Sequence, residues 1–141
     1  MEGTIYRDVQ GILLERRAEG GYDIPVPMID YLGDGDSFSV QTAASTKLIK
    51  SYIDGTRLYQ AQVRFLYRIK GDSDLSSAVP LEALDKLDAI AGDFASMNEY
   101  EMPSGRVVSA CDATTAYIIG RDEKGYITYG VTLTMTYTEE E

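Results

Sequence analysis

The sequence contains no histidine and no tryptophan, and Cys111 is its one cysteine. A protein without histidine lacks the commonest metal ligand and the only side chain whose ordinary pKa lies near neutrality. Ser-His-Asp triads, Cys-His pairs and zinc sites built on Cys/His spacing are therefore excluded. A single cysteine also excludes an internal disulfide and is typical of a reducing compartment. We predict a protein without catalytic activity, metal or cofactor.

Long hydrophobic runs are also absent. The longest, "GILL" and "AYII", are far too short to span a bilayer, and the opening "MEGTIYRDVQ" lacks the layout of a signal peptide. We therefore expect no membrane contact and a cytoplasmic location where the chain is made. The sequence shows no linker, internal repeat or low-complexity segment, so it predicts one domain over residues 1–141.

The charge of the chain is unevenly distributed. The net charge is −10, yet residues 1–70 hold nine acids and nine bases and are neutral as a whole. Residues 71–141 hold 14 acids and four bases, which gives 4 − 14 = −10, and they end in three glutamates. A split of this kind favours head-to-tail contact between copies or a basic partner, while a solvated acidic tail is the simpler explanation.

The spacing of apolar residues predicts a helix over about residues 4–19, which Gly20 and Gly21 would end, and a second helix within residues 76–100. Two prolines make residues 22–32 a sheet edge or a loop. Short strands are expected within residues 33–42 and 45–56, and longer ones over residues 59–70, 106–119 and 126–138. Polar turns are expected at residues 71–74 and 120–125.

The clearest pattern is the stretch "YQAQVRFLYRIK", residues 59–70, in which apolar residues alternate with polar and cationic ones. Residues 126–138 alternate in the same way, with a row of threonines on the polar side. Alternation indicates strands with one buried face and one open face. Because short turns join the strands, the sequence predicts an α+β fold. We expect a two-layer sandwich with an antiparallel, at most mixed, β-sheet and two helices packed on one face.

Two acidic segments, residues 34–36 and 72–74, begin like calcium-binding loops. Both lack the glycine and the glutamate that such a loop needs at its sixth and twelfth positions, so turn chemistry explains them better. Two acid pairs, Asp85/Asp88 and Asp122/Glu123, are the candidates for acid–base catalysis. We expect the first pair on the polar side of a helix and the second on a hairpin tip, where exposed carboxylates make poor general acids.

Four stretches carry a resemblance to a known family: "GDGDSFSVQ", "YIDGTRLYQAQVRFLYRIK", "LEALDKLDAI" and "AYIIGRDEKGYITYGVTLTMTY". They resemble the minor capsid (neck) proteins of tailed phages that infect Gram-positive bacteria, a group similar to tail terminators. The resemblance covers roughly residues 33–138, whereas "IPVPMIDYL" has no counterpart in the family pattern.

The resemblance implies a small, tail-terminator-like α+β subunit of a ring, commonly six-fold, in the phage neck. Such a ring caps the tail tube and joins the tail to the head. The expected partners are other copies, the tail-tube protein and a head-completion or connector protein. DNA would pass through without sequence-specific binding, and the protein would be found in the virion after assembly in the host cytoplasm.

We predict a subunit interface at residues of the polar row and the acidic end, since the cationic row has its natural complement in the acidic half of another copy. The predicted interface residues are Gln60, Gln62, Arg64, Arg68, Lys70, Glu139 and Glu140. A nucleic-acid interface along the same row is disfavoured because the chain is acidic as a whole. Two alternatives remain: a small-ligand or carbohydrate-binding module that uses exposed tyrosines, and a carboxylate-based hydrolase.

Overall fold

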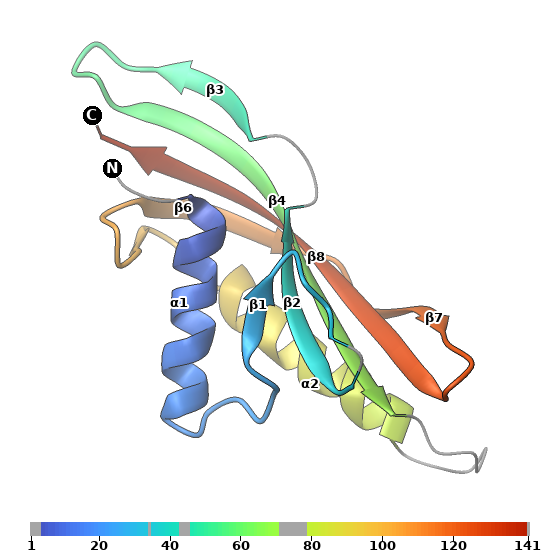
Figure 1. Ribbon diagram of the computed structural model, residues 1–141. Helices are drawn as coiled ribbons and strands as arrows, with labels where there is room; N and C mark the ends of the chain where they lie inside the picture. The colour runs from blue at the N-terminus through green and yellow to red at the C-terminus, as the bar shows by residue number, and fades with distance from the viewer. Residues whose placement is uncertain (1–3, 34, 43–45, 71–78, 141) are drawn as a thin grey trace.

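The computed structural model describes residues 4–33, 35–42, 46–70 and 79–140. Within these residues the chain forms two helices and one mixed sheet of eight strands (Figure 1). The predicted α+β fold is confirmed. In chain order the elements are α1 (Ile5–Ala18), β1 (Pro27–Ile29), β2 (Ser37–Thr42), β3 (Lys47–Ser51), β4 (Arg57–Lys70), α2 (Val79–Ala95), β5 (Tyr100–Glu101), β6 (Val107–Ala113), β7 (Tyr117–Arg121) and β8 (Tyr126–Glu139).

The sheet is built on the long antiparallel pair β4 and β8. Their register runs without a break from Arg57 opposite Glu139 to Lys70 opposite Tyr126. On the free edge of β4, β3 pairs with its beginning and β2 with its later part. On the free edge of β8, β7 pairs with its beginning and β6 with its later part. The long pair is therefore flanked by β3 and β6 at one end and by β2 and β7 at the other.

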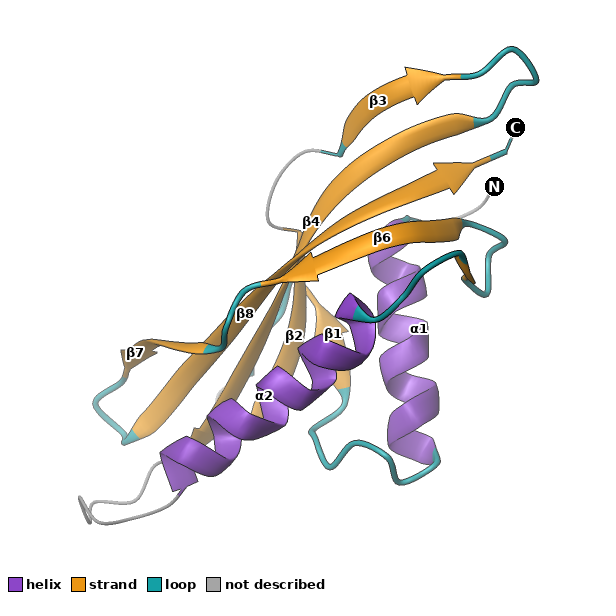
Figure 2. Cartoon of the chain, turned by 180° about the vertical axis from the view of Figure 1, so that it is seen from behind, coloured by secondary structure: helices purple, strands orange, loops and turns teal. Residues whose placement is uncertain are grey.

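Both helices lie on the same side of the sheet (Figure 2). The helix α2 packs across β8, β6 and β4, and α1 packs beside β1 and β2. The pair β1–β2 is parallel and makes the sheet mixed. As the two prolines of residues 22–32 predict, β1 lies at the edge of the sheet, where a missing N–H is tolerated.

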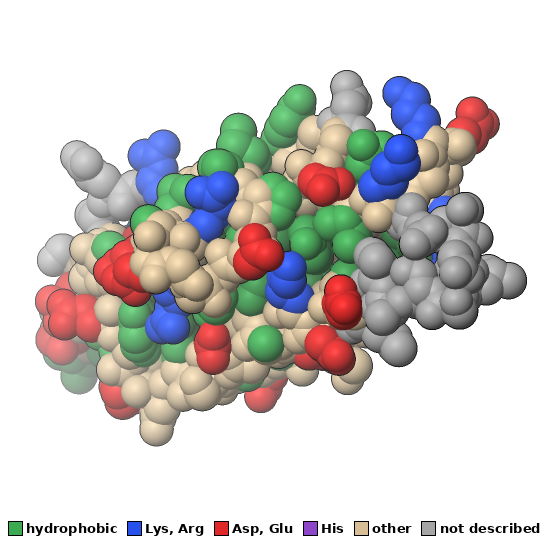
Figure 3. Space-filling view, turned by 90° about the horizontal axis from the view of Figure 1, so that it is seen from below, with side chains coloured by type: hydrophobic (Ala, Val, Ile, Leu, Met, Phe, Trp, Pro, Cys, Tyr) green, Lys and Arg blue, Asp and Glu red, His purple; other side chains and the backbone are tan. Residues whose placement is uncertain are grey.

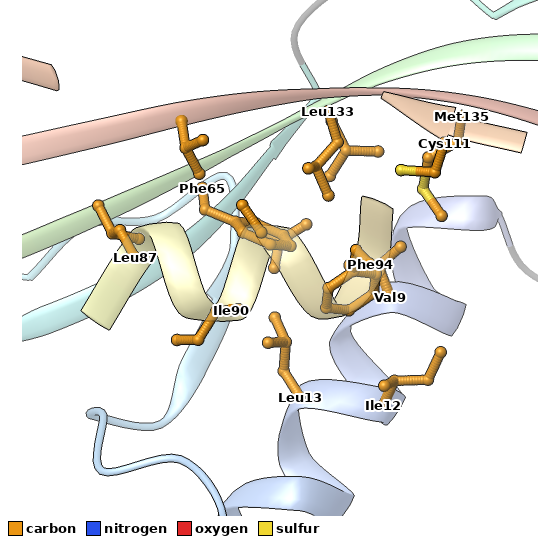
Figure 4. Close-up of a cluster of buried hydrophobic side chains, with 14 of the residues drawn as sticks. Val9, Ile12, Leu13, Phe65, Leu87, Ile90, Phe94, Cys111, Leu133 and Met135 are labelled. Atoms are coloured by element: carbon orange, nitrogen blue, oxygen red, sulfur yellow. The ribbon is translucent and has the colours of Figure 1, made fainter. Parts of the chain in front are cut away.

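One cluster of buried side chains joins the helices to the sheet (Figure 4). Val9 and Leu13 of α1 and Phe94 of α2 point toward Phe65 of β4 and Leu133 of β8. The rings of Phe65 and Phe94 meet edge to face with their centroids 5.4 Å apart. Aromatic pairs in this geometry add to the stabilisation that burial provides. The inward faces of the two alternating stretches are thus the sheet side of the core.

The predicted end of the first helix is also confirmed. Gly20 has a φ of +80° and the Gly21 N–H donates to the carbonyl of Arg16 at 2.9 Å. A residue in the left-handed conformation turns the following N–H groups toward the last carbonyls of the helix, which would otherwise be unpaired. Glycine adopts this conformation without strain.

One sequence prediction is wrong. The expected strand over residues 106–119 is two strands, β6 and β7, because the chain leaves the edge of β8 after Ala113 and returns at Tyr117. The expected helix within residues 76–100 is confirmed as α2, which ends at Ala95; β5 follows it and pairs with β6. The predicted turn at residues 71–74, with Asp72 and Asp74, lies outside the described residues, as does Asp34.

Candidate interaction surfaces

The side of the sheet opposite the helices forms an open face. Ala61, Val63, Phe65 and Tyr67 of β4 are buried against the helices, whereas the residues between them point away. Gln62, Arg64 and Lys70 are exposed, and Gln60 and Arg68 are half-buried. The threonines of β8 lie beside them on the same face. The sequence therefore predicted correctly which face is open, and the role of this face at a subunit interface stays a prediction.

Arg68 differs from its neighbours because it is bound within its own chain. Its guanidinium forms an ion pair with Asp122, and Nη1 donates to the carbonyl of Gly33 at 2.8 Å. The same group lies 4.7 Å from the ring centroid of Tyr126. Arg68 thus fastens the end of β4 to the loop before β2 and to the turn between β7 and β8. Arg64, by contrast, is exposed.

Asp122 is the acceptor at the centre of that turn. Its carboxylate accepts the backbone N–H groups of Tyr126 and Lys124, each at 2.9 Å. The bond from Tyr126, followed by those from Lys124 and Arg68, lowers the pKa of Asp122. In the other acid pair, Asp88 accepts the N–H of Ala116 at 2.7 Å. Asp122 and Asp88, one member of each acid pair considered for catalysis, therefore bind backbone N–H groups of two separate loops.

Glu139 lies on the helix side of the sheet, away from the polar row. Its carboxylate is 3.3 Å from Nε of Arg106, whose Nη1 is 2.9 Å from Asp8 of α1. Ser104 donates to the same Asp8 oxygen at 2.6 Å. The predicted interface set is therefore divided: the five β4 residues share the open face, Glu139 is part of an internal ion-pair cluster, and Glu140 is exposed.

A hollow of about 260 Å³ lies beside this cluster. Three tyrosines line it, and the rings of Tyr59 and Tyr137 stack with their centroids 5.6 Å apart. The residues around it are Thr4, Ile5, Tyr6, Thr46, Tyr59, Arg106, Tyr137 and Glu139. An aromatic wall with a polar rim is the kind of surface that binds small polar ligands.

The hairpin of β3 and the start of β4, residues 47–58, carries exposed apolar side chains; we call it the arm. All five residues of β3 are exposed, and the arm extends past the helices (Figure 1). Leu48 is 49% exposed, Ile49 46% and Ile53 at the turn 109%. Sequence reasoning predicted this strand but missed its exposure. The available signal was "KLIKSYI", in which apolar residues do not alternate, so neither face of the strand is a buried one.

A second exposed apolar surface lies at the other end of the long strand pair. Tyr117, Ile118 and Ile119 of β7 are 40%, 42% and 46% exposed, and we call them the β7 strip. A Cβ placed on Gly130 of β8 would be only 2.5 Å from Cδ1 of Ile119. Glycine at this position therefore lets Ile119 lie flat against the open face.

Charged side chains are mixed on the surface. On the side seen in Figure 3, acidic and basic groups lie among hydrophobic ones, and neither sign forms a continuous patch there. Within the described residues, no three His, Cys, Asp or Glu side chains are grouped so that they could hold a metal ion. In the same part of the chain, neither helix has the length and apolar character that crossing a membrane requires.

The chain matches no model of a protein family and no curated protein sequence.

Proposed function

We propose that this protein is a structural subunit of the phage neck, similar to a tail terminator or minor capsid protein. It forms a homo-oligomeric ring, commonly hexameric, which caps the tail tube and joins the tail to the head connector. Its partners are other copies, the tail-tube protein and a head-completion or connector protein. The ring works through contacts alone, and DNA passes through it without sequence-specific binding.

One observation carries the proposal. Two different apolar surfaces, the arm and the β7 strip, lie exposed at opposite ends of the same strand pair. Monomeric proteins rarely leave such strands uncovered, because an exposed apolar edge invites pairing with another chain. A contact between two different surfaces is heterologous and repeats from copy to copy, which gives a ring when the rotation closes. The observed α+β fold also agrees with the fold that the resemblance implies.

The test is to delete the gene from the phage genome that carries it and to examine the particles by electron microscopy. We expect tailless heads or tails of uncontrolled length, and normal particles when the wild-type gene is supplied in trans. The protein should be detected in purified complete virions. Normal tails in the deletion phage would overturn the proposal.

A second candidate function, small-ligand or carbohydrate binding, is favoured by the tyrosine-lined hollow. It requires a stable monomer in which the fluorescence of Tyr59 and Tyr137 changes when a sugar is added. The matched variants are Tyr59→Ala, which removes a wall of the hollow, and Tyr31→Ala, which removes an exposed tyrosine elsewhere. A titration with no fluorescence response, or equal responses in both variants, contradicts this function.

A further inference from the structure

We propose that the arm of one copy packs against the β7 strip of the next copy, so that the two ends of the molecule form one repeated head-to-tail contact. The inference rests on the proposed function, because a ring of copies supplies the neighbour. It goes further by naming the two surfaces that meet. The predicted row on the open face of β4 is then not the main contact.

The arm has the chemistry of a surface that another chain covers. Among the described strands, β3 pairs with β4 alone, so its outer edge is open. The start of β4 pairs with β3 on one side and with β8 on the other, so β3 is the outermost strand at this end of the sheet. Leu48, Ile49 and Ile53 gain burial only if another molecule supplies it.

The charge of the arm differs from that of the rest of the chain. The arm contains Lys47, Lys50, Arg57 and Asp54, which gives 3 − 1 = +2. The remaining residues carry −10 − 2 = −12. A basic, apolar arm on an acidic molecule is attracted to a surface of another copy.

The surroundings of the β7 strip have the opposite sign. Residues 112–124 contain three acids and two bases, and Asp88 of α2 adds a fourth acid through its bond to Ala116. Their sum is 2 − 4 = −2, and Arg68 matches one of these charges through Asp122. The strip therefore offers apolar side chains with a net acidic border, which complements the arm in both respects.

The two surfaces cannot meet within one copy. They lie at opposite ends of β4 and β8, whose fourteen residues each span roughly 46 Å at the usual rise per residue. Both β3 and β7 are five residues long, and each pairs on one side only among the described strands. Pairing of two such edges would extend the sheet from copy to copy, with apolar side chains packed across the contact.

The third exposed apolar edge is a poorer partner for the arm. It comprises Val26, Met28 and Tyr31 around β1. The strand β1 is three residues long, and Pro25 and Pro27 lack the N–H groups that a pairing strand needs. The β7 strip contains no proline.

Cysteine cross-linking tests the contact directly. Ile49→Cys places a thiol on the arm and Ile118→Cys places one on the strip, while the native Cys111 is buried and 6% exposed. On oxidation, a mixture of the two variants should give disulfide-linked dimers, and the double variant should give a ladder of higher species. Ile49→Cys mixed with Ala18→Cys, at an exposed position on α1, is the matched control and should give no dimer.

The cross-linking results distinguish the proposed contact from the alternatives. The contact is supported if dimers form in the Ile49→Cys and Ile118→Cys mixture and not in either variant alone. Dimers of Ile49→Cys alone would mean an arm-to-arm contact and would overturn it. So would the absence of cross-links at the highest attainable protein concentration. Rings of normal mass without this cross-link would overturn the arm contact and leave the proposed function standing. Cross-links combined with normal tails in the deletion phage would support the arm contact and overturn the proposed function.

A second variant separates association from folding. Ile53→Asp changes a fully exposed side chain at the turn of the arm, so the thermal unfolding midpoint should stay unchanged. We expect self-association, measured by sedimentation, to weaken at least about tenfold, since a charge replaces an apolar contact. Unchanged association in this variant would contradict the contact.

Discussion

Arg106 and Asp8 form an ion pair in the interior of the protein, although they are 98 residues apart in the sequence. Nη1 of Arg106 is 2.9 Å from Oδ2 of Asp8, and the two side chains are 3% and 8% exposed. Burial by itself lowers the pKa of Arg106, but the bonds to Asp8 and Glu139 outweigh it and raise the pKa overall. The pair holds α1 against Arg106, the residue that precedes β6. The helix is therefore fixed to the end of the sheet that β3 and β6 flank.

Asp8→Ala should be strongly destabilising because it leaves a buried guanidinium with one acidic partner fewer. Removal of one member of a buried ion pair costs about 3–5 kcal/mol, and the remaining contact with Glu139 places this variant near 3. Urea denaturation followed by circular dichroism measures the change. The matched control is Asp23→Ala, whose carboxylate is fully exposed and 3.7 Å from Lys86. It should cost less than about 1 kcal/mol, and equal losses in the two variants would contradict the role given to burial.

Reversing the charge of Arg64 and of Arg68 should change the unfolding free energy by different amounts. Arg64→Glu changes an exposed side chain and should alter the unfolding free energy by less than about 0.5 kcal/mol. Arg68→Glu should cost about 1–2 kcal/mol more, because it removes the bond to Gly33 and places two carboxylates together at Asp122. Chemical denaturation of both variants decides the point. If Arg64→Glu weakens assembly without changing stability, the open face is part of an interface, as the sequence predicts.

The sequence predicted the elements whose signals are local. The alternation around Phe65 and the helical spacing in α1 each follow from which side chains are buried, and Gly20 ends its helix by its own backbone conformation. The turn of the arm has a local signal of the same kind: Asp-Gly is a common turn pair, and the Asp54 carboxylate accepts the Thr56 N–H at 3.0 Å.

What the sequence could not predict depends on partners that are distant in the chain. The residues from Val107 to Ile119 contain no Gly or Pro that would signal a break, and the pairing along the edge of β8 decides where each strand stops. The division of the interface set has the same origin. Glu139 was grouped with the polar row because both are charged, but its partner Arg106 lies on the helix side, which no local pattern reveals.

Cys111 should react slowly in the folded protein. Burial, with a smaller contribution from Asp112, raises the pKa of its thiol to about 12. At pH 8 the thiolate population is then on the order of 10³ times lower than at the ordinary value of 9.0. Labelling with a thiol reagent should therefore be slow until the protein is unfolded in urea. Fast labelling of the folded protein would contradict this prediction.

The same shift determines how stability depends on pH. Because the folded pKa lies above the unfolded one, the contribution of Cys111 is complete below pH 9 and is lost as the pH rises toward 12. Burial also raises the pKa of Tyr137 to about 12, which acts in the same direction above pH 10. The unfolding free energy should fall across this range, and it should fall less steeply in Cys111→Ala. An equal slope in that variant would mean that the thiol is not the group that titrates.

Gly130→Ala tests the close approach of β7 to the open face. The added Cβ would be 2.5 Å from Cδ1 of Ile119, so this side chain must rotate outward. Ile119 is half-exposed and can move, at a cost of about 0.5–1.5 kcal/mol for a strained rotamer. Alanine returns about 0.5–1 kcal/mol by restricting the unfolded chain. The unfolding free energy of Gly130→Ala, measured by thermal unfolding, should therefore change by less than about 1 kcal/mol. The displaced Ile119 should weaken the contact proposed for the β7 strip. Ile119→Ala in the same chain removes the clash, so adding Gly130→Ala to it should leave association unchanged and raise the unfolding free energy by about 0.5–1 kcal/mol. A loss as large as that of a core substitution, about 3 kcal/mol, would mean that Ile119 is held rigidly.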